Sequence, residues 1–382
     1  MKEYRYLYQK MLDEKNIRKA YKHLRKGKTK RDEIKYIDGH LDEEVVKMRE
    51  MIKNTRPGEV EDPGLAYQPC RRTPKYIREH KKARKIYMPE IHEQWLHHII
   101  VLVLGPIVMS TIYPYSCGSI PKRGAHYGKK QMEKWIRENK GIRYFAKIDI
   151  RHFYDNIRLD ILMRELSIQI KDDWFLYIIR TCLQGFEKGI PLGFYISQWL
   201  ANYFLAPLDA LILKQLGMKK YMRYMDDMVI FSENKKTLHR AVADIRQMLG
   251  RRFRLRLKHN YQVCKFDFVK KNGECIGRPV DFMGFIFFRD RTVIRKSIML
   301  AAVRLASKMD KQKTARRGYY GRHIRAMLSY MGWFMHCSAY ACYTQYIKPH
   351  VDIGRLKKII SKIDRREDHD TMERRTLSAQ TG

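Results

Sequence analysis

The chain has 382 residues, of which 45% are hydrophobic and 12% aromatic. This content excludes a disordered protein and is enough to fill the core of a large catalytic body. Lys and Arg number 78 against 41 Asp and Glu, a formal net charge of +37. A surplus of this size indicates a polyanionic partner, RNA or DNA, with binding that weakens as salt rises.

Seven scattered cysteines include no Cys-x-x-Cys pair, which argues against a disulfide framework and favours a reduced, cytoplasmic setting. Residues 1–65 are charged and helix-forming, and the prolines near their end indicate a boundary. Between Tyr67 and Pro89, basic residues mix with β-formers, which predicts a strand pair. This pair would present Lys82 and Arg84 to a nucleotide or template; the alternative is a solvated basic face.

An apolar segment follows, from Trp95 to Tyr113. Gly105 and Pro106 interrupt it, and its continuous apolar part is shorter than the roughly 20 residues that a bilayer span needs. We therefore expect a buried helix and no membrane partner. After it, a loop rich in glycine presents Arg123 ahead of a helix that should begin near Ala125. Arginine and free amides at a helix start suit a triphosphate.

The second half of the chain predicts strands, then helices. Residues 144–157 read as a strand that runs into a turn and a helix, and residues 189–213 as a loop that feeds a long apolar helix. Residues 221–232, YMRYMDDMVIFS, read as strand, turn and strand with an acidic tip. Further strands are expected up to about residue 295, followed by helices.

The acidic tip consists of Asp226 and Asp227, two like charges at a place where aspartate is uncommon. A divalent cation would neutralise them, and Asp149 at the end of another predicted strand would complete a site for two Mg²⁺ ions about 3.5–4 Å apart. Mn²⁺ could substitute. Such a site activates a primer 3′-hydroxyl and stabilises the leaving pyrophosphate. The alternative is an ordinary Asp-Asp turn.

These segments resemble a known family in order and spacing. FAKIDIRHFYDNI resembles the first palm motif of prokaryotic reverse transcriptases of the group II intron and retron-like superfamily, and GIPLGFYISQWLAN resembles their loop–helix motif. YMDD resembles their Tyr-x-Asp-Asp box, and LRLKHNYQVCKF and DFMGF resemble the two motifs that follow. The resemblance covers roughly residues 20–365 and implies an α+β right-hand polymerase.

The implied parts of the chain are an N-terminal helical extension (1–65), fingers (66–143), a palm (144–295) with a fingers insertion near 158–188, a helical thumb (296–365) and a disordered tail (366–382).

The resemblance also implies roles for single residues. The catalytic metal ligands would be Asp149, Asp226 and Asp227, with the backbone carbonyl of Ile150. Contacts to the nucleotide are expected from Lys82, Arg84, Arg123, Tyr154, Leu192, Gly193, Gln198 and Lys258. Contacts to primer and template are expected from Tyr224, Met225, Met283 and Gly284. Lys258 would act as general acid for the pyrophosphate, with Lys265 as its rival.

Tyr154 lies five residues after Asp149, where the family places a bulky side chain beneath the sugar. A ring there would clash with a 2′-hydroxyl, so the resemblance implies deoxynucleotide substrates. The alternative role is an aromatic side chain that merely packs in the palm.

Leu192-Gly193 and Ser197-Gln198 replace the Gln-Gly and Ser-Pro of most relatives. This form resembles the enzymes of diversity-generating retroelements, which copy a template RNA with errors at adenines. The competing interpretation is a bacterial antiviral reverse transcriptase. A further possibility is protein-primed or untemplated DNA synthesis by the same active site. A catalytically inactive RNA-binding protein is the alternative of another class. The implied partners are a template or non-coding RNA, the DNA product, deoxynucleoside triphosphates and an accessory protein. The implied location is the cytoplasm, for a protein that a bacterium or a phage encodes.

Overall fold

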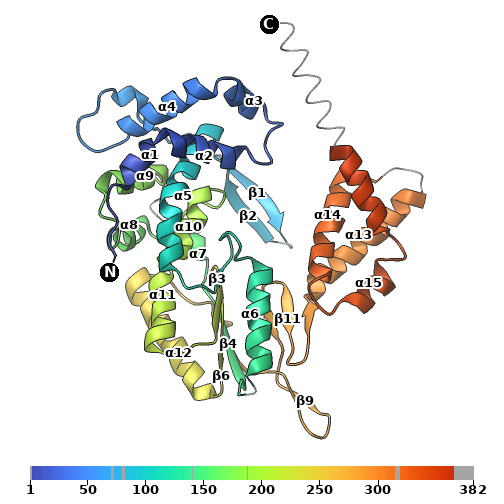
Figure 1. Cartoon of the computed structure of the whole chain (residues 1–382). Helices are drawn as coiled ribbons and strands as arrows, with labels where there is room; N and C mark the ends of the chain where they lie inside the picture. Colours follow the sequence, from blue (N-terminus) through green and yellow to red (C-terminus); the bar gives the residue numbers. More distant parts are fainter. Residues whose placement is uncertain are drawn as a thin grey trace. The chain divides into compact units, whose positions relative to one another are not determined.

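The computed structural model describes residues 2–69, 73–79, 82–139, 141–186, 188–314 and 319–364. The chain is an α+β protein that forms two compact units. The first unit comprises Met1–Gly124 and Ala146–Val263, and the second comprises Ala125–Phe145 and Cys264–Gly382. Figure 1 shows their elements. The division into fingers, palm and thumb stays a prediction, and the tail at 366–382 lies outside the described residues.

The first unit begins with the helices that the sequence predicts: α1 (Leu7–Leu12), α2 (Glu14–Arg25), α3 (Asp32–Gly39) and α4 (Leu41–Asn54). Helix α2 starts at Asp13, whose side chain accepts a hydrogen bond from the amide of Lys15. Such a cap satisfies one of the free amides at a helix start. The apolar residues of α2 recur with helical spacing and are buried in the core: Ile17, Ala20, Tyr21 and Leu24.

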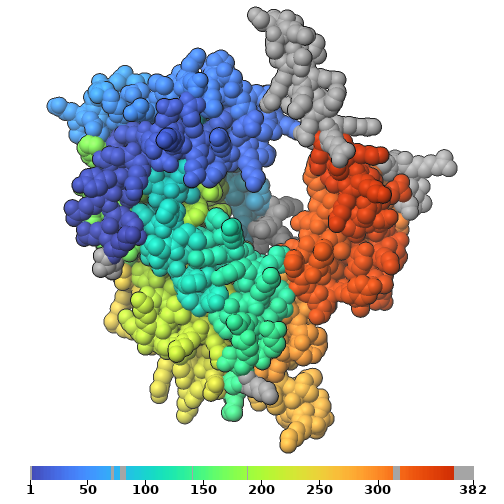
Figure 2. Space-filling view, viewed as in Figure 1, coloured from blue at the N-terminus to red at the C-terminus, as the bar shows by residue number. Residues whose placement is uncertain are grey.

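Helix α5 (Ile91–Thr111) is the predicted apolar helix. Among the described residues, it is the one helix long and apolar enough to cross a membrane, but most of it is buried inside the unit. It packs against α2 and α10 (Tyr195–Phe204), and the Trp95 indole donates to the carbonyl of Ile17 at 2.9 Å. The N-terminal helices (blue) and the α5 segment (teal) form one continuous surface in Figure 2. Burial within the unit supports the core-helix interpretation.

The first unit also contains a strand pair and most residues of a five-stranded sheet. Strands β1 (Pro74–Glu79) and β2 (Lys82–Tyr87) pair antiparallel, as predicted. A five-stranded sheet has the order β3-β5-β6-β4-β7. Its strands are β3 (Ser116–Cys117), β4 (Tyr144–Asp149), β5 (Tyr221–Tyr224), β6 (Asp227–Ser232) and β7 (Gln262–Lys265).

The remaining helices of the first unit include two π-helical turns. A turn of this kind arises when a single residue is inserted into an α-helix, and it occurs often at functional sites. They are Leu211–Gln215 and Leu249–Phe253. The α-helices are α7 (Phe153–Asn156), α8 (Leu159–Ser167), α9 (Asp173–Cys182), α10, α11 (Ala206–Ala210) and α12 (Lys235–Met248).

The second unit contains helix α6 (Ala125–Glu138), which begins where the sequence predicts. Its strands are β8 (Phe268–Val269), β9 (Cys275–Ile276), β10 (Val280–Phe282), β11 (Phe285–Phe287) and β12 (Thr292–Ile294). The predicted C-terminal helices follow as α13 (Lys296–Thr314), α14 (Gly321–Phe334), α15 (Tyr340–Tyr346) and residues 353–364. These helices bury an apolar core that includes Ile298, Met309 and Met327.

Candidate active site

The three aspartates of the sequence motifs lie at the ends of neighbouring strands. Asp149 is the last residue of β4, and β6, which starts with Asp227, lies beside it in the sheet. Strands β5 and β6 are joined by the two-residue turn Met225-Asp226, and Tyr224 pairs with Asp227 across it. The amide of Ile150 donates to the carbonyl of Asp226 at 3.3 Å. The sheet therefore brings the predicted catalytic residues to one edge.

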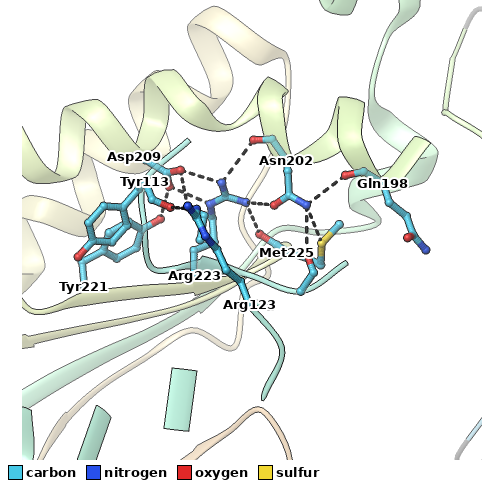
Figure 3. Close-up of polar contacts among 10 residues, drawn as sticks. Tyr113, Arg123, Gln198, Asn202, Asp209, Tyr221, Arg223 and Met225 are labelled. Atoms are coloured by element: carbon cyan, nitrogen blue, oxygen red, sulfur yellow. Dashed lines mark hydrogen bonds and ion pairs between the residues drawn. The ribbon is translucent and has the colours of Figure 1, made fainter. Parts of the chain in front are cut away.

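A buried polar network contacts this turn (Figure 3). The guanidinium of Arg223 is fully buried and donates to both carboxylate oxygens of Asp209, at 2.8 and 2.7 Å. It also donates to the carbonyl of Met225 at 3.1 Å and to the side-chain oxygen of Asn202 at 3.2 Å. Tyr221 donates to Asp209 at 2.8 Å. Such a charge pair is tolerable in a core because nearly every donor has a partner.

The end of β3 and the residue that follows it also form hydrogen bonds that hold the turn. The amide of Met225 donates to the carbonyl of Cys117 at 3.0 Å, and Asn202 donates to the carbonyl of Gly118 at 3.2 Å. Met225 has φ 55°, in the left-handed region that a side chain rarely adopts. The turn therefore holds a strained backbone that several hydrogen bonds stabilise, a situation typical of functional sites.

The carboxylates have different electrostatic surroundings. Asp149 Oδ2 forms an ion pair with Lys258 Nζ at 2.5 Å, and Asp227 Oδ2 lies 3.8 Å from Lys147 Nζ. Burial, and then the charge of Asp149, raise the pKa of Asp226 to about 6. The charged form of Asp226 is therefore costly until a cation neutralises it.

The donor set fits a divalent cation. Asp149 Oδ1 is buried and has no hydrogen-bond partner in the part of the chain that the structure describes. The same part contains no group of three or more His, Cys, Asp or Glu arranged to hold a metal. Mg²⁺ is commonly held by only one or two carboxylates, with water and substrate phosphate as its other ligands. Asp149 and Asp226 match that pattern rather than a closed protein cage.

The family of the chain follows from comparison with known proteins. A family model described as "Reverse transcriptase (RNA-dependent DNA polymerase)" matches residues 74–287, more than half of the chain. The chain belongs to this reverse transcriptase family. The matched range contains Asp149, Asp226 and Asp227.

Individual relatives of this reverse transcriptase are distant. The group II intron-encoded protein LtrA of Lactococcus lactis subsp. cremoris is 28% identical over 193 residues, which cover 48% of this chain and 30% of LtrA. The chain thus spans about a third of the length of that relative. A solved telomerase structure from Candida albicans, which contains a fragment of telomeric RNA, has a TM-score of 0.44 at 11% identity. A solved structure of apo telomerase from Candida tropicalis has a TM-score of 0.46 at 11% identity. They cover 74% and 76% of this chain and 55% and 61% of theirs.

Tyr154 of the reverse transcriptase lies close to the aspartates. It is in the short helix α7, just after β4, and its carbonyl accepts a hydrogen bond from the amide of Ile190 at 2.9 Å. Burial, and then the negative charge of Asp226, raise the pKa of Tyr154. Arg84 lies close enough to lower the pKa values of both Tyr154 and Asp226. The structure thus brings two predicted nucleotide contacts toward the aspartates, whereas their roles stay predictions.

The loop before α10 docks on the strand pair. The amide of Tyr87 in β2 donates to the carbonyl of Leu192 at 2.7 Å. Gly193 has φ 105°, and a Cβ atom there would collide with the carbonyl oxygen of Tyr87. This position therefore requires glycine. Gln198 is exposed on α10.

The other predicted contacts have varied surroundings. The side chain of Lys82 lies outside the described residues. The Arg123 guanidinium donates to the carbonyl of Tyr113 at 3.3 Å and lies near the Arg223–Asp209 pair in Figure 3. Met283 and Gly284 form the turn between β10 and β11 in the second unit, where a Cβ on Gly284 would contact the ring of Trp333.

Sequence reasoning missed Asp209, Arg223 and Asn202, which hold the Met225-Asp226 turn. A signal was present. Arg223 lies in an apolar strand and Asp209 in an apolar helical segment, and buried charges are rare unless they are paired. Arg223 and Asp209 have opposite charges, and each lies in an otherwise apolar element. The sequence could therefore have predicted that they form a pair.

Proposed function

We propose that this chain is an RNA-directed DNA polymerase that adds deoxynucleotides to a primer 3′-hydroxyl on an RNA template. The observation that carries the proposal is the position of Asp149 and Asp226 at adjoining strand ends. Asp149 has a buried oxygen with no hydrogen-bond partner among the described residues, and Asp226 has a raised pKa. Two carboxylates so placed in a reverse transcriptase family member suit two Mg²⁺ or Mn²⁺ ions.

Bound ions of this kind would lower the pKa of the 3′-hydroxyl and neutralise charge on the triphosphate. Asp149 and Asp226 would hold them, with the Ile150 carbonyl as a further ligand. Asp227 already has the Lys147 ammonium nearby, at 3.8 Å, so we assign it a supporting role.

Lys258 is the favoured general acid. Its ammonium contacts Asp149 directly, whereas its rival Lys265 lies in β7 and has no ion pair among the described residues. When Asp149 is neutralised by a cation, the ammonium becomes free to turn to the leaving pyrophosphate. A donor there contributes typically 100- to 10,000-fold to a rate, as an order of magnitude.

The biological setting that we propose is a diversity-generating retroelement that a bacterium or a phage encodes, with the protein in the cytoplasm. Leu192 supports it, because an apolar side chain cannot form the hydrogen bond that glutamine would offer at this position. With leucine at this position, the protein would control the base pair between the template and the incoming nucleotide less strictly. The competing setting, antiviral defence with a bound non-coding RNA, predicts untemplated or repetitive products instead.

Primer extension tests the proposal. Purified chain, Mg²⁺, deoxynucleotides and a DNA primer annealed to an RNA of defined sequence should give full-length complementary DNA. Chelation of Mg²⁺ should stop synthesis. Sequencing of the product then separates the settings, since errors concentrated at template adenines support the retroelement and untemplated sequence supports defence. RNA binding without nucleotide incorporation under all primer and metal conditions would establish the inactive RNA-binding alternative.

A further inference from the structure

Several positively charged side chains gather in the first unit, beside the candidate active site. Two hollows of about 710 and 370 Å³ share Arg151 and Arg256 in their walls. The larger hollow is also lined by Lys188 and Arg254, and the smaller one by Arg246 and Tyr261. We refer to these six residues as the basic trough.

The local fold explains why the cations share one side. Leu255 and Leu257 are buried, whereas Arg254 and Arg256, which alternate with them, are exposed. Backbone hydrogen bonds hold this segment against the end of β4. The amide of Arg151 donates to the carbonyl of Arg256 at 2.8 Å, and the Lys258 amide bonds the Asp149 carbonyl at the same distance. The cations of this segment therefore lie beside the candidate active site.

These charges are not balanced by acidic partners in the described part of the chain. In the described residues, the side chains of Arg151, Lys188, Arg254 and Arg256 have no ion pair and no hydrogen bond. Asp155 is the acidic residue in the wall of the larger hollow, and it lies 3.6 Å from His152. Like charges gathered in a hollow repel one another, so their arrangement is favourable only when a polyanion occupies it.

The backbone of the same wall is strained. Arg254 and His152 have φ values of 56° and 46°, in the left-handed region where glycine or asparagine would be easier. Two non-glycine residues that retain such a conformation in one hollow indicate that their side chains serve a purpose there.

The smaller hollow adds a surface for a base. The guanidinium of Arg246 lies over the ring of Tyr261, 5.2 Å from its centre, and the ring is only partly buried. An aromatic ring beside a row of cations is the combination that binds single-stranded nucleic acid without regard to sequence, since every base can stack and every nucleotide has a phosphate.

We propose that the basic trough is a second nucleic-acid site, which binds the backbone of single-stranded RNA outside the polymerisation site. A nucleoside triphosphate is the smaller alternative. The trough offers five arginine and lysine side chains across two hollows, a spread that suits several successive phosphates better than one triphosphate. This binding goes beyond polymerisation and does not depend on it.

Direct binding tests the proposal in the Asp226→Asn protein, so that the result does not depend on synthesis. The probe is a fluorescent, unstructured single-stranded RNA without a primer, titrated by anisotropy at several salt concentrations. The trough variant carries Lys188→Gln, Arg254→Gln and Arg256→Gln. The control variant carries Lys235→Gln, Lys236→Gln and Arg240→Gln, an equal loss of charge from exposed residues of α12 that line neither hollow.

The trough variant should bind RNA at least about tenfold more weakly, and its slope of log affinity against log salt should fall by about 2, since each lost contact to single-stranded RNA removes ~0.7. The control should lose much less. In a separate arm, Tyr261→Ala should weaken binding while Tyr261→Phe preserves it, because stacking requires only the ring.

Equal losses in trough and control variants would overturn the proposal, since they would show a general effect of net charge. Unchanged RNA affinity would overturn it as well. If the three trough substitutions, made in the chain with Asp226 intact, raise KM for deoxynucleotides without affecting RNA binding, the trough serves the triphosphate instead.

Discussion

Arg223 and Asp209 form an ion pair inside the first unit, and the same guanidinium donates to the carbonyl of Met225 in the turn between β5 and β6. The side chains of both residues are almost completely enclosed, at 0% and 2% exposure. The position of Asp226, the next residue, is therefore coupled to a buried charge pair.

Replacement of Arg223 by Met should destabilise the protein by about 3–5 kcal/mol, because Asp209 would remain buried without a partner. The double variant Arg223→Met, Asp209→Leu should recover much of that stability. It should still have a low kcat with little change in KM, since the Met225 carbonyl loses its donor. Urea unfolding and primer extension measure the two effects. Full turnover in a folded double variant would show that the pair does not position the turn.

Gly193→Ala should abolish most activity while the rest of the fold is retained. The added methyl group would collide with the carbonyl of Tyr87, so the loop could no longer dock on β2. Gly185→Ala is a matched control, because its φ is 85° yet nothing lies within 4 Å of its Cβ position. Primer extension by the two variants makes the comparison. Similar losses in both would mean that backbone strain alone, not the contact with Tyr87, accounts for the effect.

Tyr154 should discriminate deoxynucleotides through its ring. Its raised pKa keeps the hydroxyl protonated at neutral pH, so the hydroxyl contributes no charge. Tyr154→Phe should therefore preserve the preference for deoxynucleotides, whereas Tyr154→Ala should incorporate ribonucleotides more readily, by roughly tenfold or more. The ratio of kcat/KM for the two sugars is the measurement. An unchanged ratio in Tyr154→Ala would leave the ring with a packing role only.

The pKa of Asp226 predicts a competition between protons and Mg²⁺. In the metal-free protein this pKa is about 6, above the ordinary value of 3.8, so the folded state binds the proton more tightly than the unfolded state. Its contribution to stability is present at low pH and is lost as the pH rises from about 4 to about 6. The Mg²⁺ concentration needed for half-maximal activity should therefore increase as the pH falls below about 6.

Asp226→Asn offers a check on this account. At neutral pH the metal-free variant should melt higher than the metal-free wild type, because the amide has no charge to bury. Mg²⁺ should raise the melting temperature of the wild type more than that of the variant. A wild type that is equally stable from about pH 4 to about pH 7, with no response to Mg²⁺, would contradict the assigned pKa shift.

Much of the site could be predicted because its signals are local. Two aspartates between apolar strands predicted a turn at Asp226-Asp227, and the structure has it one residue earlier, at Met225-Asp226, with Asp227 as the first residue of β6. The strand that ends at Asp149 and the helix that begins at Ala125 were likewise visible in short windows. Local periodicity and turn chemistry decide such elements.

The rest depends on contacts between segments far apart in the sequence. No window around Gly193 reveals the carbonyl of Tyr87, and none around Lys258 reveals that its ammonium binds Asp149. The motif comparison left Lys258 and Lys265 as rivals, and the contact between Lys258 and Asp149 is visible only in the fold. The pairing of distant strands and the burial of charges depend on contacts across the whole sheet. A short stretch of sequence therefore cannot predict them.

The central claim is that Asp226 takes part directly in the chemistry. Primer extension on an RNA template under single-turnover conditions, with wild type and Asp226→Asn side by side, tests it most directly. The account predicts a rate lower by on the order of 1,000-fold or more, with the fold and the RNA affinity of the variant preserved. DNA synthesis by a folded Asp226→Asn protein at a rate near that of the wild type would contradict the account.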